Sequence, residues 1–299
     1  MHLDTTAGRT KSSCGPHTRH SLQSRVSKVA GKVLHYLGLV ILGIVFGFPF
    51  YWLVSTSLKV DTQLFVVPPI LIPHPVVWKN YPAVFGYLPF HRYIFNTIVI
   101  TTATIAGVLF SCPLGAYAFS RLRWPGRDVA FLGILATMML PGQVTLIPQY
   151  MLFKILGWID SWQPLWIPAW FGSAFYIFLL RQFFLTIPND LEDAAKIDGA
   201  GYLTTYLRIM LPLVKPALAT VVIFSFIGSW NNFLGPLIYI NTTDKFPISL
   251  ALQLFETLHN AQYGLLMAAS TIATLPIVIL FFFTQRYFIQ GIVLTGIKG

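Results

Sequence analysis

Six long stretches of this chain contain no Asp, Glu, Lys or Arg, and they constrain its fold more than any other feature. A helix needs about 20 consecutive apolar residues to cross the hydrocarbon core of a bilayer. Each of the six stretches reaches that length, so we predict an all-α integral membrane protein with six transmembrane helices. The expected spans are Val33–Leu58, Tyr93–Ser120, Val129–Phe153, Ser161–Leu180, Pro216–Thr243 and Thr257–Gln285.

The composition agrees with a membrane location. Hydrophobic residues make up 55% of the chain and charged residues only 10%, whereas a soluble domain carries about 25% charged residues. The formal net charge is +10, which in a soluble protein would suggest nucleic acid. Here the sequence contains no basic stripe interleaved with exposed aromatics, so we expect no nucleic-acid partner.

The distribution of basic residues predicts how the chain is oriented. If the N-terminus is cytoplasmic, 15 of the 20 Lys and Arg residues lie on the cytoplasmic side of the six spans. Cytoplasmic loops carry an excess of Lys and Arg, so we expect both termini to be cytoplasmic and the protein to be multi-pass in the cell membrane. Residues 1–32 are polar and basic and are expected to form a disordered cytoplasmic tail, not a signal peptide.

One further apolar run, Leu64–Trp78, is too short and too rich in proline to be a span. Pro68, Pro69, Pro73 and Pro75 lie within it. Proline lacks the amide donor that a helix needs. We therefore predict an extended loop on the external side.

Polar side chains within the spans suggest a translocation pathway. The adjacent Asn231 and Asn232 lie inside the fifth span, and Gln143 follows Pro141-Gly142 in the third. Adjacent residues of a helix point about 100° apart, so one asparagine could face another subunit and the other a pore. Hydrogen bonding between helices is an equally good interpretation. No span contains an ionised residue, which argues against a proton- or sodium-coupled pump.

The cytoplasmic loop 188–214 has the pattern of two short helices around a turn. Asn189 is a good N-cap, and Glu192 lies three residues later, as in a capping box. Gly199 and Gly201 permit a sharp reversal, and a second helix is expected to stop at Pro212. A loop this ordered suggests a docking surface for a protein.

This loop resembles the EAA loop of permeases of binding-protein-dependent ABC importers. That motif reads Glu-Ala-Ala, three residues, Gly, nine residues, Ile, one residue, Leu-Pro. The spacing matches throughout, and the one departure is an aspartate in place of the glutamate. The residues at the motif positions are Asp193, Ala194, Ala195, Gly199, Ile209, Leu211 and Pro212, to which Glu192 and Asp198 add flanking charge.

The resemblance covers roughly residues 33–299 and is closest to the maltose-type branch of carbohydrate uptake. It implies the type I ABC importer permease fold and three kinds of partner: a second homologous permease in a heterodimer, a cytoplasmic ATPase dimer that binds the 188–214 loop, and an extracytoplasmic solute-binding protein. It also implies that the C-terminal tail 286–299 reaches the ATPase through Gly296, Lys298 and Gly299. The source would be a prokaryote.

The chain is not expected to be an enzyme or to bind a cofactor. It contains no Gly-x-x-x-x-Gly-Lys-[Ser/Thr] phosphate loop, so ATP would be used by the partner ATPase. No catalytic residue or metal ligand is assigned. A sugar or oligosaccharide is the expected solute, with a polyol or glycerol phosphate as the alternative. A self-sufficient secondary transporter and a membrane scaffold without transport are two further classes that we consider less well supported.

Overall fold

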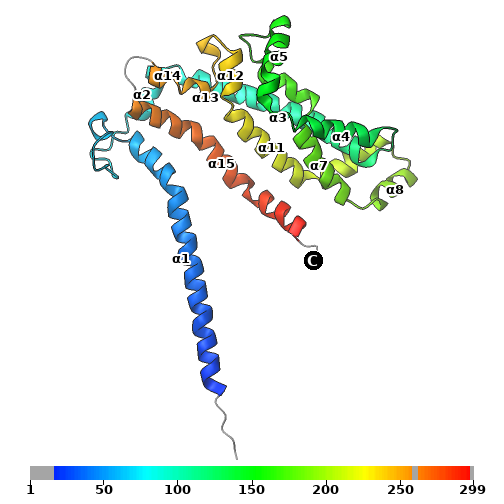
Figure 1. The fold of residues 1–299 in the computed structure, drawn as a ribbon, viewed down its shortest axis with the longest axis horizontal. Helices are drawn as coiled ribbons and strands as arrows, with labels where there is room; N and C mark the ends of the chain where they lie inside the picture. The colour runs from blue at the N-terminus through cyan, green and yellow to red at the C-terminus, as the bar shows by residue number, and fades with distance from the viewer. Residues whose placement is uncertain (1–16, 258–261, 297–299) are drawn as a thin grey trace, which may run out of the picture. The chain divides into compact units, whose positions relative to one another are not determined.

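The computed structural model describes the backbone of residues 17–257 and 262–296, and in this part of the chain every regular element is helical. The chain falls into two units, residues up to Trp52 and residues from Leu53 onward. Figure 1 shows the course of the chain. The elements are α1 (His17–Ser57), η1 (Asp61–Gln63), α2 (Asn80–Tyr87), α3 (Phe90–Arg121), α4 (Arg127–Thr137), α5 (Gly142–Ile155), α6 (Gln163–Trp166), η2 (Ile167–Phe171), α7 (Ala174–Thr186), α8 (Asp190–Ile197), α9 (Tyr202–Thr205), η3 (Tyr206–Met210), α10 (Leu211–Leu213), α11 (Lys215–Trp230), α12 (Leu234–Tyr239), η4 (Thr243–Lys245), α13 (Ile248–Ala251), α14 (Leu254–Thr257) and α15 (Tyr263–Gly296).

Within the described residues, three helical segments are long and apolar enough to cross a membrane unaided: Gly31–Ser57, Phe90–Arg121 and Tyr263–Gln285. Three bent helix pairs bring the number to six when each pair is counted as one span. The all-α membrane fold expected from the sequence is therefore confirmed. The run Leu64–Trp78 contains no helix, as its prolines predicted.

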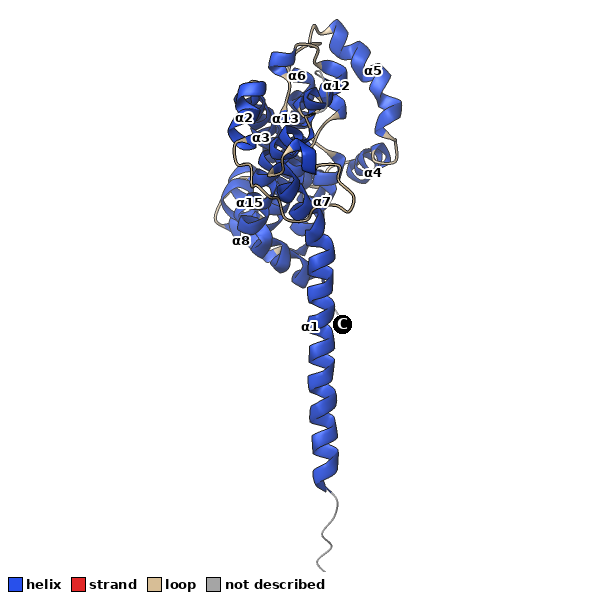
Figure 2. Ribbon diagram, turned by 90° about the vertical axis from the view of Figure 1, so that its left-hand side faces the viewer, coloured by secondary structure: helices blue, strands red, loops and turns tan. Residues whose placement is uncertain are grey.

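The third expected span is broken near its middle. α4 ends at Thr137 and α5 begins at Gly142, and their axes differ by 96°. Pro141 lies at the corner with an extended backbone, φ −59° and ψ 133°. It cannot donate an amide hydrogen bond, and it disfavours helical geometry in the residue before it. Figure 2 shows α4 and α5 meeting at this corner.

The helix α1 begins earlier than the sequence analysis expected. Its first residue is His17, so the prediction of a disordered tail over residues 1–32 is wrong for residues 17–32. The segment from His17 to Ala30 contains neither Pro nor Gly, and adding a residue to an existing helix is far easier than starting a new one. The apolar part of α1 can therefore extend its helix backward toward Pro16. Residues 1–16 lie outside the described part.

The helix α3 forms the centre of the second unit and packs against α7, α11 and η2. Small residues on α3, among them Gly107, Ser111 and Gly115, permit this close approach. The Ser111 hydroxyl donates to the Ala169 carbonyl at 3.0 Å. A Cβ atom built on Gly107 would lie 2.4 Å from the Trp170 ring, so the indole occupies the space that a side chain would need.

We expect Gly107→Val to lower the thermal stability of the detergent-solubilised protein. Overpacking a well-filled contact costs about 1–3 kcal/mol, and the rigid Trp170 ring cannot move aside as a flexible side chain would. Gly133→Val is the matched control, because nothing lies within 4 Å of a Cβ atom at Gly133 on α4. Fluorescence melting curves of both variants measure the difference in melting temperature. Equal melting temperatures would contradict the close contact.

Candidate functional site

The 188–214 loop is built from α8, a turn at Gly199, and a second helical segment, α9–η3–α10. Its two short helices confirm the pattern that the sequence suggested. The second segment has a π-helical stretch at Tyr206–Met210 and continues one residue beyond Pro212, to Leu213. There the chain bends by 77° into α11. In Figure 1, α8 lies at one end of the second unit and α2 and α14 at the other.

Gly199 closes α8 with a left-handed backbone, φ +75°. The Gly199 amide donates to the Lys196 carbonyl at 3.0 Å, and the Ala200 amide donates to the Ala195 carbonyl at 2.9 Å. These two bonds form a Schellman motif, in which glycine is favoured because it has no Cβ to clash in this conformation. The glycine of the motif is therefore required by the turn. Gly201, by contrast, is extended, with φ −74° and ψ 165°.

We expect Gly199→Ala to reduce transport several-fold while membrane insertion is unchanged. A left-handed conformation costs a non-glycine residue about 1–2 kcal/mol, which loosens the turn after α8. Gly201→Ala is the matched control, since its backbone suits any residue and nothing lies within 4 Å of its Cβ position. Uptake by membrane vesicles, normalised to the inserted protein, is the measurement. An equal effect of both substitutions would contradict this explanation.

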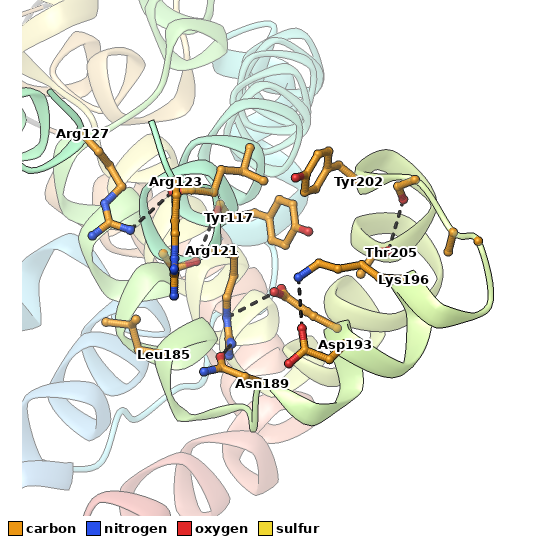
Figure 3. Close-up of a pocket in the computed structure, with 16 residues that line it drawn as sticks. Tyr117, Arg121, Arg123, Arg127, Leu185, Asn189, Asp193, Lys196, Tyr202 and Thr205 are labelled. Carbon is orange, nitrogen blue, oxygen red and sulfur yellow. Dashed lines mark hydrogen bonds and ion pairs between the residues drawn. The ribbon is translucent and has the colours of Figure 1, made fainter. Parts of the chain in front are cut away.

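The last residue of α3, Arg121, holds α8 in place (Figure 3). Its guanidinium donates to the Asn189 side-chain oxygen and to the carbonyls of Phe184 and Ile187. Its Nε atom lies 3.8 Å from a carboxylate oxygen of Glu192, and the two side chains are only 5% and 11% exposed. A buried cation is tolerated because it is paired and hydrogen-bonded in this way. Arg121 therefore fixes the start of α8 against the membrane helices.

The predicted capping box is wrong. Asn189 lies at the N-cap of α8, but its side chain makes no cap hydrogen bond. It accepts from Arg121 instead, and Glu192 also turns inward to Arg121. The helix begins with backbone bonds only: the amides of Glu192 and Asp193 donate to the Asn189 carbonyl at 2.9 and 3.1 Å. The buried guanidinium takes the Asn189 side chain by a charge-assisted hydrogen bond. It draws the Glu192 carboxylate inward by charge alone, since their nearest atoms are 3.8 Å apart.

The EAA-like residues divide between two faces of the loop. Ala195 is buried, whereas Ala194, Asp193 and Asp198 are exposed, and Asp193 pairs with Lys196 at 3.1 Å. Glu192 points inward to Arg121, so its carboxylate does not add charge to the exposed face of the loop. In the second segment Ile209 and Leu211 pack partly against the core of the unit, and Pro212 is exposed.

The inner face of the loop packs on the membrane helices. Tyr206 and Met210 are buried against Tyr117 and Phe184, and the rings of Tyr117 and Tyr206 are 5.2 Å apart. Burial raises the pKa of Tyr206 to about 12, so its hydroxyl stays neutral. The inner face of the loop is thus part of the hydrophobic core, so the loop is expected to move together with the helices that form this core.

The outer face exposes apolar side chains. Ile197 is 87% exposed. Further exposed apolar residues on this face are Leu191, Tyr202, Leu203 and Leu207. Exposed apolar side chains gathered in one short loop are typical of an interaction site. A cavity of about 960 Å³ lies beside it, between the loop and the α3–α4 turn, and is lined by Arg121, Arg123, Arg127, Lys196 and Tyr202 among others.

The candidate pathway residues are only partly brought together. Gln143 and Asn232 line one cavity of about 780 Å³ between α5, α6–η2 and α12, whereas Asn231 does not line it. The expectation of a continuous helix through both asparagines is wrong, because α11 ends at Trp230 and α12 begins at Leu234. The Asn232 side chain accepts from the Gly235 amide at 3.1 Å, and the Asn231 side chain donates to the Ile227 carbonyl at 3.0 Å. Both amides thus compensate backbone groups at the break.

Of the C-terminal residues singled out by the sequence, Gly296 is the last residue of α15. Lys298 and Gly299 lie outside the described residues. The anchoring role of Arg121 was not predicted from the sequence. A basic residue at the end of a long span was the only available signal, and Arg123 and Arg127 share it.

Comparison with known proteins decides the family. Residues 107–293, which include the loop and both cavities, match the model of the binding-protein-dependent transport system inner membrane component. The chain belongs to this family. It is therefore a membrane permease subunit of a binding-protein-dependent importer.

Individual relatives of this permease extend over almost its whole length. It is 33% identical to the arabinooligosaccharides transport system permease protein AraQ of Bacillus subtilis, over 94% of this chain and 99% of that protein. It is 31% identical to the trehalose/maltose transport system permease protein MalG of Thermococcus litoralis, over 91% and 99%. The structure of a bacterial ABC transporter involved in the import of the acidic polysaccharide alginate contains a chain with a TM-score of 0.77 and 25% identity, over 88% and 98%.

Proposed function

We propose that this permease forms half of the translocation pathway for a sugar or oligosaccharide, and that a cytoplasmic ATPase dimer drives it through the 188–214 loop. The observation that carries the proposal is the loop itself. Arg121 anchors α8 rigidly to α3, while the opposite face of the loop exposes Ile197 and its apolar neighbours. A rigidly anchored loop with an exposed apolar face can bind a partner domain and transmit its movement to the membrane helices.

The assembly that follows has four kinds of component. The second half of the pathway comes from a homologous permease in a heterodimer, and the solute arrives on an extracytoplasmic binding protein. The excess of basic residues near the 188–214 loop and near the termini of this chain supports a cytoplasmic position for the loop and for both termini. ATP is bound and hydrolysed by the ATPase, and the C-terminal tail with Gly296, Lys298 and Gly299 adds a second contact to it.

The solute class rests on the names of the relatives and on the chemistry of the cavity. Gln143 and Asn232 offer amide groups in a cavity that also contains aromatic side chains such as Trp158, a combination suited to hydroxyl-rich ligands. Glycerol phosphate is the alternative, since the chain is 34% identical to the sn-glycerol-3-phosphate transport system permease protein UgpE of Yersinia enterocolitica, over 82% of this chain and 90% of that protein.

Cross-linking tests the proposed docking. With the natural cysteines replaced, Ile197→Cys is expected to form a cross-link to a co-purifying ATPase in native membranes. Asn241→Cys is the control, because it is also exposed but lies outside the 188–214 loop, in the connection after α12. Mass spectrometry of the mild-detergent complex should recover the ATPase, a second permease and the binding protein. Purification of this chain alone, under conditions that preserve other ABC complexes, would refute the proposal.

Uptake assays test the solute class. Labelled oligosaccharides, a polyol and glycerol 3-phosphate are supplied to proteoliposomes that contain the complete complex and its binding protein. Gln143→Leu is expected to reduce uptake of the transported solute while leaving the assembly intact, because Gln143 is exposed to the cavity and bonds to no described group that would hold the fold. Uptake of glycerol 3-phosphate alone would favour the alternative.

A further inference from the structure

The loop between α1 and α2 carries its apolar side chains on the outside. Val67 is 90% exposed, Phe65 72%, Ile72 67% and Trp78 68%. From Leu64 through Trp78 the sequence has no Asp, Glu, Lys or Arg. Soluble monomeric proteins rarely present so many large apolar side chains to water in one loop. Something other than water must therefore face this loop.

The loop has a defined shape, so the exposure is not the result of a loose chain. The Val77 amide donates to the Leu58 carbonyl at 2.9 Å. The Ser55 hydroxyl donates to the Leu71 carbonyl, and the Gln63 side chain donates to the His74 carbonyl. These bonds tie the middle and the end of the loop back to its beginning. The apolar tips cannot fold inward without breaking them.

Two contacts fix the level of the loop relative to the membrane helices. The Phe65 ring packs edge to face on the Tyr263 ring at 5.0 Å, and Tyr263 is the first residue of the apolar span Tyr263–Gln285. Ser55, which holds Leu71, lies at the end of the span Gly31–Ser57. The loop is thus tied to the last residues of α1 and to the first residue of α15, each of which is an end of an apolar span.

The backbone of the loop suits the boundary between lipid and water. Irregular backbone facing lipid is not tolerated in the hydrocarbon core, because its polar groups have no partner there. Four of the residues from Leu64 to Trp78 are prolines, which have no amide donor to leave unpaired. Trp78 adds a residue type that is enriched at membrane interfaces. These features favour the headgroup level over either bulk water or the core.

We propose that this loop rests in the interfacial region of the bilayer, with Phe65, Val67 and Ile72 in contact with lipid. The inference depends on the membrane-spanning fold. Only the leaflet, the outer one, depends on the topology given under the proposed function. The loop would then hold the outer ends of the spans at a fixed depth while the permease moves.

Fluorescence quenching by lipids tests the contact. In a chain with Cys14 and Cys112 replaced, Val67→Cys is labelled with an environment-sensitive nitrobenzoxadiazole probe and reconstituted, in its complex, into sealed liposomes. Lipids with a nitroxide near the headgroup are expected to quench the probe at least twofold more than the same probe on Asn241→Cys, an exposed position in a loop of the same unit. The emission of the Val67→Cys probe should also be blue-shifted.

Two results would overturn the proposal. Quenching by aqueous iodide with no response to nitroxide lipids would place the loop in water. A blue shift that develops only when the solute-binding protein is added would make the loop a protein-docking surface instead. Iodide added outside sealed vesicles quenches the Asn241→Cys probe only if that residue faces the outside. This control measures the topology separately, so a wrong topology can be told apart from a loop that does not contact lipid. Val67 packs against little, so its replacement leaves folding intact.

Discussion

Replacing Arg121 by methionine should lower transport by roughly a hundredfold. The substitution removes the donor for Asn189 and for two carbonyls and leaves the Glu192 carboxylate buried without its partner. Breaking a buried ion pair on one side costs about 3–5 kcal/mol, and each 1.4 kcal/mol is about tenfold in an equilibrium constant. The population of correctly placed α8 falls accordingly. Uptake and solute-stimulated ATP hydrolysis by the reconstituted complex are the measurements.

The control is Arg123→Met in the same turn. Arg123 is exposed and lines the same cavity, but it does not hold the loop, so we expect less than a threefold loss. The double variant Arg121→Met with Glu192→Leu should recover part of the activity, because the unpaired charge is then gone. If the double variant is as impaired as the sum of the two single variants, Arg121 does not act through Glu192.

Replacing Asp160 by alanine should destabilise the unit by about 3 kcal/mol, because hydrogen bonds to a charged group contribute about 1.5–3 kcal/mol each and are not additive. Its carboxylate accepts from the amides of Asn241 and Thr242, from the Thr242 hydroxyl and from Lys245 at 2.8 Å. These bonds join the loop after α5 to the loop after α12. Chemical or thermal unfolding in detergent, followed by tryptophan fluorescence, measures the loss.

The same contacts predict a dependence on pH. The hydrogen bond from Lys245, followed by those from Thr242, lowers the pKa of Asp160 from its usual 3.8. A carboxyl whose pKa is lower in the folded state stabilises the fold above its unfolded pKa, and this contribution is lost as the pH falls through the folded value. The stability difference between the wild type and Asp160→Asn should therefore be constant at neutral pH and shrink below about pH 4.

Asp244→Ala is the matched control for Asp160. Asp244 pairs with Arg92 at 3.1 Å, but both side chains are more than half exposed, and such pairs contribute about 0–1 kcal/mol. If Asp244→Ala lowers the stability as much as Asp160→Ala does, the number of hydrogen bonds that a carboxylate accepts does not predict its contribution to the stability of this unit.

The sequence was a reliable guide wherever the chemistry is local. Apolar runs without charge identified the spans, because no other fold accommodates such runs. The spacing from Asp193 to Pro212 identified the family. Gly199 was expected at a reversal, and the structure places it at φ +75°, since the restriction on a left-handed residue acts within the residue itself.

Contacts between distant parts of the chain were not predictable in the same way. The capping box at Asn189 failed because Arg121, 68 residues earlier, takes its side chain. Gln143 and Asn232 share a cavity only because α4–α5 is bent at Pro141 and α11–α12 is broken after Trp230. A sequence pattern records which side chains can bond, but competition among several available partners is settled by their positions in space.

By itself, then, the sequence determined the membrane environment, the helical spans, the proline-rich loop and the motif of the 188–214 loop, because hydrophobicity and backbone restrictions act over a few residues. Only the tertiary structure decided which charges meet, where the spans break and which faces remain exposed. Burial makes the difference: once α3, α7 and α8 pack together, Arg121 has to be compensated by whatever lies within reach, and Glu192, Asn189 and the end of α7 are what the fold brings there.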